Sequence, residues 1–282
     1  MPPLGLLLDV DGPIACPITR SIVIESITRD LVTIANLGVP VVFNTGRSDA
    51  FIRDEVVKPL LAGGLLPEAR VFGVCEKGAV WFGATIDNFS GVHVDETAVI
   101  APAIVAEFRA LFDARYSDTM FWDETKRTMV SIEQRTEVPA AEFFAAQARY
   151  TSDAFELLER HSVGAELAGR VSAHPVTVRI DPTIISTDVE AIALGKDLGA
   201  ERALGLLRSS GPLPRLWRTV GDSRTDYAMA DYLHAEGFDV AHVDVRPVDG
   251  IPEKPYRVIT EGDLIHDHAG AAFLAHWVRQ LT

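Results

Sequence analysis

The chain has 282 residues, a length that at about 150 residues per domain predicts one or two domains, and we expect two. Hydrophobic residues make up 48% and charged residues 23%, a composition that excludes collagen-like, low-complexity and disordered chains. The 26 Lys and Arg residues against 40 Asp and Glu residues give a net charge of −14, which disfavours an extended nucleic-acid or anionic-membrane surface.

The first third of the chain alternates short apolar runs with helical patterns. The first run ends in Asp9-Val10-Asp11-Gly12, the second is followed by Thr45-Gly46-Arg47, and Ser48 or Asp49 can cap the helix after it. Strands that alternate with helices of this length predict a parallel sheet covered on both faces. The expected elements are strands at 4–10, 39–43, 71–74 and 79–82 and helices at 19–37 and 48–61.

The pattern changes between about residues 85 and 182. A helix followed by two strands occurs there twice, which favours an antiparallel sheet with helices on one face. The expected elements are a helix at 99–115, strands at 119–122 and 128–133, a helical region at 140–161 and two strands ending at 176–180.

After residue 182 the first pattern returns. Ser186, Thr187 or Asp188 is expected to cap a helix that reaches about residue 207. The remaining elements are expected at 216–220 (strand), 225–236 (helix), 238–243 (strand) and 267–281 (helix). We therefore predict an α/β fold, with a Rossmann-like parallel-sheet core formed by 1–84 and 184–282 and an α+β domain inserted at 85–183.

The chain shows no sign of export or of membrane insertion. Cys16 and Cys75 are too few for a disulfide framework, and no apolar run reaches the roughly 18 residues of a spanning helix. The N-terminus lacks the basic and then apolar layout of a signal peptide. We expect a cytoplasmic protein that binds neither nucleic acid nor membrane.

Polar residues follow three of the predicted strands: Asp9 and Asp11, Thr45-Gly46-Arg47, and Asp222 to Asp226. Each segment alone would be read as a turn or a helix cap. In an open parallel sheet, however, ligands bind beyond the carboxyl ends of the strands, where these segments would meet. Carboxylates that converge need a counter-charge, and oxygen ligands of this kind favour Mg²⁺.

This constellation resembles the haloacid dehalogenase (HAD) superfamily, and within it the Cof-like phosphatases of subfamily IIB. The motif of two Asp residues separated by one residue and followed by Gly matches Asp9 to Gly12, and the motif Thr-Gly-Arg matches Thr45 to Arg47. The motif Gly-Asp-Ser-x-x-Asp matches Gly221 to Asp226, and Lys196 is the one lysine between the insert and that motif. Glu76-Lys77-Gly78 is similar to the Glu-Asn-Gly turn that Cof-like members carry before an α+β cap domain.

The resemblance implies a role for each of these residues. Asp9 would be the nucleophile that forms an aspartyl-phosphate, and Asp11 would be the general acid and base. Thr45, Gly46 and Lys196 would bind the phosphoryl group. Magnesium would be held by Asp9, by the backbone carbonyl of Asp11 and by Asp222, with Asp226 in support.

Substrate selection is expected to involve cations of the insert and polar residues of the core. Candidates are Lys126, Arg127 and Arg179 in the insert and Arg47 and Glu76 in the core, although ordinary surface roles are open for each cation. His266-Asp267-His268 has the look of a metal site, but we interpret it as a helix start.

The leading hypothesis is an Mg²⁺-dependent phosphatase for a small phosphorylated metabolite, with a sugar phosphate or a glycosyl-phosphoglycerate favoured. A phosphomannomutase-like phosphotransferase and a non-catalytic phosphometabolite-binding protein are the alternatives. Two residues depart from the family pattern, Pro13 where Thr is usual and Thr225 where Asn is usual. Neither departure replaces Asp9, Asp11 or Asp222, so we expect an active enzyme.

Overall fold

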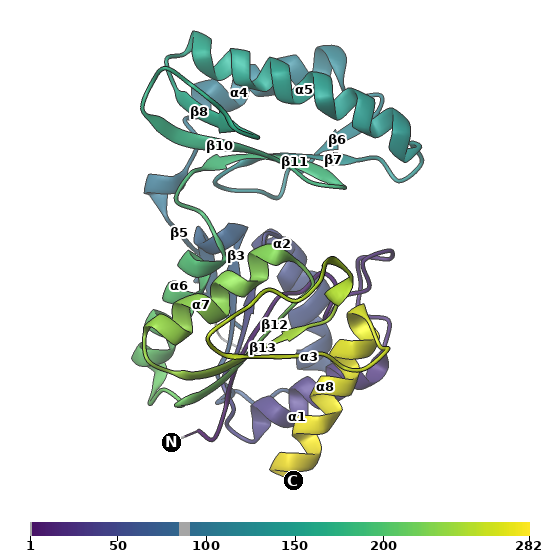
Figure 1. Cartoon of the computed structure of the whole chain (residues 1–282), viewed down its shortest axis with the longest axis vertical. Coiled ribbons are helices and arrows are strands. Elements are labelled where there is room, and N and C mark those ends of the chain that lie inside the picture. The colour runs from purple at the N-terminus through teal and green to yellow at the C-terminus, as the bar shows by residue number, and fades with distance from the viewer. Residues whose placement is uncertain (1, 85–90) are drawn as a thin grey trace. The chain divides into compact units, whose positions relative to one another are not determined.

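The computed structural model describes residues 2–84 and 91–282 of the chain (Figure 1). The chain divides into two compact units, one made of Met1–His93 with Gly195–Thr282 and the other made of Val94–Leu194. The first has a mainly parallel sheet with helices on both faces, and the second has a separate sheet with helices on one face. The predicted α/β fold with an inserted α+β segment is confirmed.

The first unit is built on one sheet of eight strands in the order β14-β13-β12-β1-β2-β3-β4-β5. From β14 to β3 each strand is parallel to its neighbour, and β4 returns antiparallel to β3. The strands are β1 (Gly5–Leu8), β2 (Val41–Asn44), β3 (Val71–Cys75), β4 (Val80–Gly83), β5 (His93–Val94), β12 (Leu216–Gly221), β13 (Asp239–Asp244) and β14 (Arg257–Ile259).

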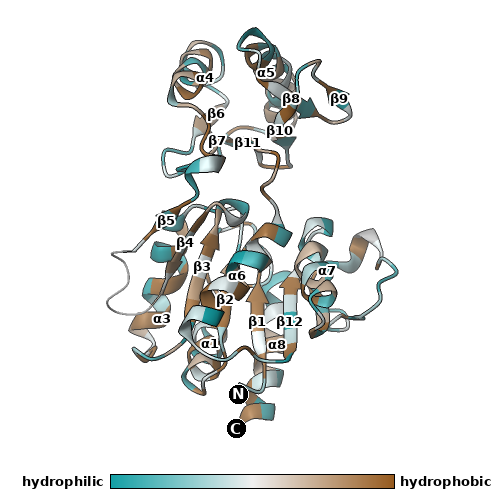
Figure 2. Cartoon of the chain, turned by 90° about the vertical axis from the view of Figure 1, so that its left-hand side faces the viewer, coloured by the Kyte–Doolittle hydropathy of each residue, from teal (hydrophilic) through white to brown (hydrophobic). Residues whose placement is uncertain are grey.

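Helices cover both faces of this sheet (Figure 1). They are α1 (Glu25–Asn36), α2 (Asp49–Phe51), which continues through a π-helical stretch (Ile52–Val57) into α3 (Lys58–Ala62), α6 (Lys196–Ser210), α7 (Tyr227–Ala235) and α8 (His266–Leu281). Helices α6 and α7 share an apolar cluster with Leu7, Val42 and Val74, while α1 contacts α3 and α8. Because both faces are covered, β1 is buried at every position, and Figure 2 shows the central strands in the brown of apolar residues.

The second unit has a sheet of six strands in the order β6-β7-β11-β10-β8-β9. Its strands are β6 (Met120–Trp122), β7 (Val130–Gln134), β8 (Gly164–Leu167), β9 (Arg170–Val171), β10 (Val176–Pro182) and β11 (Ser186–Ala191), and its helices are α4 (Pro102–Arg115) and α5 (Ala140–Arg160). The two helices lie on one face of this sheet (Figure 1). Alternate strand residues such as Val130, Ile132 and Val189 join them in one apolar cluster.

The prediction of a helix starting at Ser186, Thr187 or Asp188 is wrong, because these residues lie in β11. That strand pairs antiparallel with β10 on one side and with β7 on the other. Its side chains alternate, since Val189 joins the apolar cluster whereas Asp188 accepts a hydrogen bond from the Ser131 hydroxyl at 2.6 Å. The helix begins later, at Lys196.

This strand also moves the expected domain boundary. We predicted that the insert ends at 183, but the second unit continues to Leu194 because β11 completes its sheet. The other predicted boundary, 84/85, borders residues outside the described part of the chain, and the division falls between His93 and Val94.

Smaller differences concern the ends of elements. The helix expected at 19–37 begins only at Glu25, and β14 has no counterpart among the predicted strands. None of the helices in the described ranges combines the length and the apolar run that crossing a bilayer requires.

Candidate active site

Asp9 and Asp222 lie beside each other because they follow neighbouring parallel strands. β1 pairs with β12, and the pairing continues past β1, where the Asp9 N–H donates to the Val220 carbonyl at 2.8 Å. One carboxylate oxygen each from Asp9, Asp222 and Asp226 lies within 4.8 Å of the other two. The predicted convergence of carboxylates at the strand ends is therefore present in the structure.

Lys196 is the cation of this cluster. Its Nζ lies 2.7 Å from Asp9 Oδ1 and 2.6 Å from Asp226 Oδ1, and its side chain is only 9% exposed. Burial opposes a charged lysine, but the charges of Asp226 and Asp9 outweigh it and hold the pKa of Lys196 above its usual value. A positive charge is unfavourable at the N-terminus of a helix because of the helix dipole. The carboxylates of Asp9 and Asp226 offset this cost for Lys196, the first residue of α6.

The two carboxylates that face Lys196 differ in their surroundings. Burial raises the pKa of Asp9 well above its usual value; Lys196 opposes this, and the charges of Asp226 and Asp11 add to it. Burial also opposes ionisation of Asp226, but Lys196 and a hydrogen bond from Ser223 outweigh it and lower the pKa of Asp226. Of the two carboxylates, Asp226 is thus the one whose charged form its surroundings favour.

Asp226 also fixes the loop that carries Asp222. Its Oδ2 accepts hydrogen bonds from the backbone N–H groups of Asp222 at 3.2 Å and Ser223 at 3.0 Å, and from the Ser223 hydroxyl at 2.7 Å. Its Oδ1 contacts Lys196. Both oxygens are therefore engaged by protein groups, which favours a positioning role for Asp226.

Asn44, at the end of β2, is a site residue that the sequence interpretation missed. Its side-chain Nδ2 donates to the Lys196 carbonyl at 2.8 Å, and Lys196 Nζ donates to the Asn44 carbonyl at 2.9 Å. A Cβ atom at Gly199 would lie 1.9 Å from Asn44 Oδ1, so α6 can approach this strand only with glycine at that position. A polar residue at the end of an otherwise apolar strand was the available signal.

Asp11 is paired with Arg47. The Arg47 Nε and Nη2 atoms donate to the two carboxylate oxygens of Asp11 at 2.8 and 2.9 Å, and the guanidinium stacks over the Phe51 ring at 4.7 Å. The Arg47 N–H also donates to the Thr45 hydroxyl at 3.1 Å. We predicted Arg47 as a substrate residue, whereas the structure places its side chain on the candidate acid and base.

The Thr45-Gly46-Arg47 loop rests on the turn Glu76–Gly78. The N–H of Glu76 donates to the Arg47 carbonyl, and the N–H of Lys77 donates to the Thr45 carbonyl, both at 3.0 Å. Glu76, Lys77 and Gly78 all have positive φ values, of 47°, 55° and 104°. Glu76 is fully buried within the turn that supports the loop, and its contact with substrate stays a prediction.

Three glycines let backbone approach the carboxylate cluster. A Cβ atom at Gly12, whose φ is +93°, would lie 2.8 Å from side-chain atoms of Asp222, and one at Gly221 would lie 2.2 Å from the Asp226 Cβ. A Cβ atom at Gly270 in α8 would lie 1.8 Å from the Pro13 carbonyl oxygen. The segments 9–13, 221–226 and the start of α8 are therefore packed together without room for a methyl group.

The donor set fits a hard divalent cation. Asp9 and Asp222 present carboxylate oxygens, which Mg²⁺ prefers, and they lie close enough to share one ion. Burial raises the pKa of Asp222 to about 6, and the charge of Asp226 adds to that shift. A bound cation would relieve the repulsion within this cluster.

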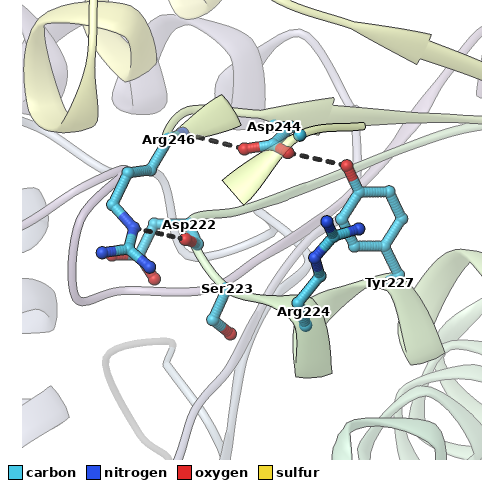
Figure 3. Close-up of a pocket in the computed structure, with 7 residues that line it drawn as sticks. Asp222, Ser223, Arg224, Tyr227, Asp244 and Arg246 are labelled. Carbon is cyan, nitrogen blue, oxygen red and sulfur yellow. Dashed lines mark hydrogen bonds between the residues drawn. The ribbon is translucent and has the colours of Figure 1, made fainter. Parts of the chain in front are cut away.

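A small, partly open hollow lies on one side of Asp222 (Figure 3). There Arg246 Nε donates to the Asp222 carbonyl at 3.1 Å, and the Arg246 N–H and the Tyr227 hydroxyl hold the two oxygens of Asp244. None of Asp9, Lys196 and Thr45 lines this hollow. It therefore borders the carboxylate cluster without containing it.

The remaining predicted substrate residues belong to the second unit. Arg179 in β10 donates to Glu190 of β11 at 2.5 Å and to the Leu194 carbonyl at 2.9 Å. Lys126 and Arg127 lie between β6 and β7, where Arg127 is exposed and Lys126 is half-buried. Their contact with a substrate stays a prediction.

Solved structures similar to this fold include hydrolases. No protein-family model matches the chain, and no curated protein is similar to it in sequence. A haloacid dehalogenase-like hydrolase from Bacteroides thetaiotaomicron is 13% identical, with a TM-score of 0.59 over 97% of this chain and 98% of that one. The chain therefore has the fold of the haloacid dehalogenase-like hydrolases, as its motifs predicted.

Two similar structures are sugar phosphatases by their descriptions. The C-terminal domain of C. albicans trehalose-6-phosphate phosphatase is 13% identical, with a TM-score of 0.67 over 100% of this chain and 94% of that one. The sucrose-phosphatase of Synechocystis sp., in complex with sucrose and phosphate, is 13% identical, with a TM-score of 0.52 over 98% of each chain. The narrower assignment to the Cof-like branch stays a prediction.

Proposed function

We propose that this protein is an Mg²⁺-dependent phosphatase that hydrolyses a small phosphorylated metabolite through an aspartyl-phosphate on Asp9. The observation that carries the proposal is the arrangement of Lys196 between Asp9 and Asp226, with Asp222 in the same cluster. A nucleophilic carboxylate, a buried cation beside it and a carboxylate that can hold a metal ion are the groups that phosphoryl transfer through an aspartyl-phosphate would use.

In the first step a carboxylate oxygen of Asp9 attacks phosphorus and the bond to the ester oxygen breaks. Asp11 donates a proton to the departing oxygen, so an alcohol leaves and Asp9 carries the phosphoryl group. In the second step Asp11 takes a proton from water, whose oxygen attacks phosphorus. The bond to Asp9 then breaks, and inorganic phosphate is released.

The other residues bind and orient. Lys196 offsets the negative charge that develops on the phosphoryl oxygens, and the Thr45 and Gly46 loop binds these oxygens from the adjacent strand end. Asp9 and Asp222, with the backbone carbonyl of Asp11, would hold Mg²⁺, which would neutralise carboxylate and phosphoryl charge. Asp226 supports this set by holding Lys196 and the Asp222 loop.

The favoured substrates are sugar phosphates and glycosyl-phosphoglycerates. The similarity to the trehalose-6-phosphate and sucrose phosphatases supports the sugar phosphates. The second unit, with Lys126, Arg127 and Arg179, would act as the cap that selects the substrate. We propose the cytoplasm as the site of action, because phosphorylated metabolites and Mg²⁺ occur there together.

The experiment is a phosphate-release screen with trehalose 6-phosphate, sucrose 6-phosphate, hexose phosphates and glycosyl-phosphoglycerates, with Mg²⁺ and with a chelator. We expect release that needs Mg²⁺ from at least one ester, and loss of release in Asp9→Asn. Interconversion of hexose phosphates without net phosphate release would indicate the mutase. Binding of an ester without turnover would indicate a non-catalytic protein, and release unchanged in Asp9→Asn would refute the mechanism.

A further inference from the structure

His266, the first residue of α8, lies beside the carboxylate of Asp222. Its Nδ1 is 3.7 Å from Asp222 Oδ2. The sequence interpretation treated this histidine as part of a helix start, and no step of the proposed reaction uses it. Its side chain thus lies next to a candidate metal ligand and has no assigned role.

The Nδ1 atom of His266 is buried, and it has no hydrogen-bond partner among the residues that the structure describes. Buried polar atoms in native proteins nearly always have a partner in the protein or in ordered water. The 3.7 Å to Asp222 Oδ2 is too long for a direct hydrogen bond, and a polar separation of this size suggests that a third group contacts both atoms. That group would lie next to the carboxylate that is proposed to bind Mg²⁺.

The backbone holds the imidazole in this place at a conformational cost. His266 has a φ of +51°, in the left-handed region that few residues other than glycine adopt. Its N–H donates to the Val245 carbonyl at 2.8 Å. One turn further, Gly270 packs directly on the Pro13 carbonyl, which fixes the start of α8 against the 9–13 segment. Strained backbone that its surroundings maintain in this way is common at functional sites.

We propose that His266 is a positioning residue for the metal centre, and that its Nδ1 accepts a hydrogen bond from the hydration shell of a divalent cation held at Asp222. In the neutral imidazole with the proton on Nε2, Nδ1 is an acceptor, as this contact requires. The inference rests on the proposed function only in taking Asp222 as a metal ligand. It adds a residue to the centre that the sequence motifs do not include.

The test measures Mg²⁺ affinity by titration calorimetry on the full chain, without substrate. The variant His266→Gly removes the imidazole while it relieves the left-handed backbone, so its melting temperature should equal or exceed that of the wild type. We expect its Mg²⁺ affinity to fall about 10-fold, the lower end of the range for residues that act behind metal ligands. His266→Asn tolerates the same φ and supplies an acceptor oxygen, so it should recover most of the affinity.

His268→Ala is the matched control, because His268 is exposed in the same turn of α8 and should leave Mg²⁺ affinity unchanged. Wild-type affinity in His266→Gly would overturn this inference alone, because Mg²⁺ binding and the proposed reaction would remain. No Mg²⁺ binding by the wild type would overturn both the inference and the Mg²⁺ dependence of the proposed function.

Discussion

Asn44 and Lys196 exchange two hydrogen bonds, each donating from its side chain to the backbone carbonyl of the other, at 2.8 and 2.9 Å. The pair joins the end of β2 to the start of α6. It sets both the position of the helix and the place of the lysine between Asp9 and Asp226. Substitutions near this pair should therefore change both the stability of the fold and the position of Lys196 in the site.

The close approach of α6 to Asn44 predicts opposite effects of one substitution at two glycines of the same helix. Glycine in a helix interior ordinarily costs about 1 kcal/mol relative to alanine. At Gly205 an added Cβ meets nothing within 4 Å, so Gly205→Ala should stabilise the chain by up to about that amount. At Gly199 the Cβ would lie 1.9 Å from Asn44 Oδ1, so Gly199→Ala should destabilise by about 1–3 kcal/mol.

Urea unfolding of both variants measures the difference. Equal stabilisation by the two alanines would mean that Asn44 has room to move away. The two hydrogen bonds between Asn44 and Lys196 would then hold the lysine less firmly than the structure indicates.

Loss of the buried cation should be costly. Lys196→Met leaves Asp9 and Asp226 facing each other without a positive charge, and removing one partner from a buried ion pair costs about 3–5 kcal/mol. Lys58→Met is the control, because Lys58 and its partner Asp54 are 68% and 56% exposed and such pairs contribute at most about 1 kcal/mol. Denaturant unfolding near pH 7.5 compares them. Similar losses in both variants would contradict the proposed energetic role of Lys196.

The raised pKa of Asp222 predicts that the folding stability of the metal-free protein depends on pH. Its pKa is raised from 3.8 to about 6, so between these values the folded chain keeps a proton that the unfolded chain has lost. Stability therefore falls as the pH rises through this window and stays lower above it. In chelator above pH 6, Asp222→Asn should be more stable than the wild type, by up to about 3 kcal/mol at 1.36 kcal/mol for each pKa unit.

Calorimetric melting from pH 4.5 to 8, in chelator and in Mg²⁺, checks this. Mg²⁺ should stabilise the wild type above pH 6 and have little effect on Asp222→Asn. A variant less stable than the wild type in chelator at pH 8 would be the contrary result.

The pairing of Arg47 with Asp11 predicts the kinetic effect of Arg47→Lys. Lysine offers one point charge where the guanidinium makes two hydrogen bonds, so Asp11 should be poorly oriented. If the protein is a phosphatase, kcat should fall about 10-fold or more with little change in KM, since general acid and base groups contribute about 10²- to 10⁴-fold.

A double-mutant cycle separates this role from substrate binding. With Asp11→Asn in place, Arg47→Lys should cause no further loss if the arginine acts through Asp11. If Arg47 instead binds a second anionic group of the substrate, as its sequence context first suggested, KM should rise and the two losses should add.

The sequence was most informative where local chemistry decides the structure. Buried strands must end in turns, so the polar segments at Asp9, Thr45 and Asp222 could be placed at one edge of the sheet before the structure was known. The sequence was least informative where pairing between strands that are far apart in the chain decides the secondary structure. Ser186, Thr187 and Asp188 are good helix caps, and only pairing with β7 and β10 makes them a strand.

The hydrogen-bond and ion-pair partners of individual side chains also could not be predicted from the sequence. Arg47 could reach a substrate or a neighbouring carboxylate, and the choice depends on where Asp11 lies across the strand ends. Asn44 and Lys196 meet only because α6 crosses β2 at Gly199, a contact between segments far apart in the chain. His266 could be read as a helix start, and it is one, but its contact with Asp222 appears only when α8 is placed.

The tight packing of Gly12, Gly221 and Gly270 has a consequence for mutational tolerance. A side chain at any of the three would overlap Asp222, Asp226 or the Pro13 carbonyl, whatever the substrate is. A library of variants selected only for folded protein should therefore retain glycine at these positions. Such a selection would outline the carboxylate cluster without any assay of activity.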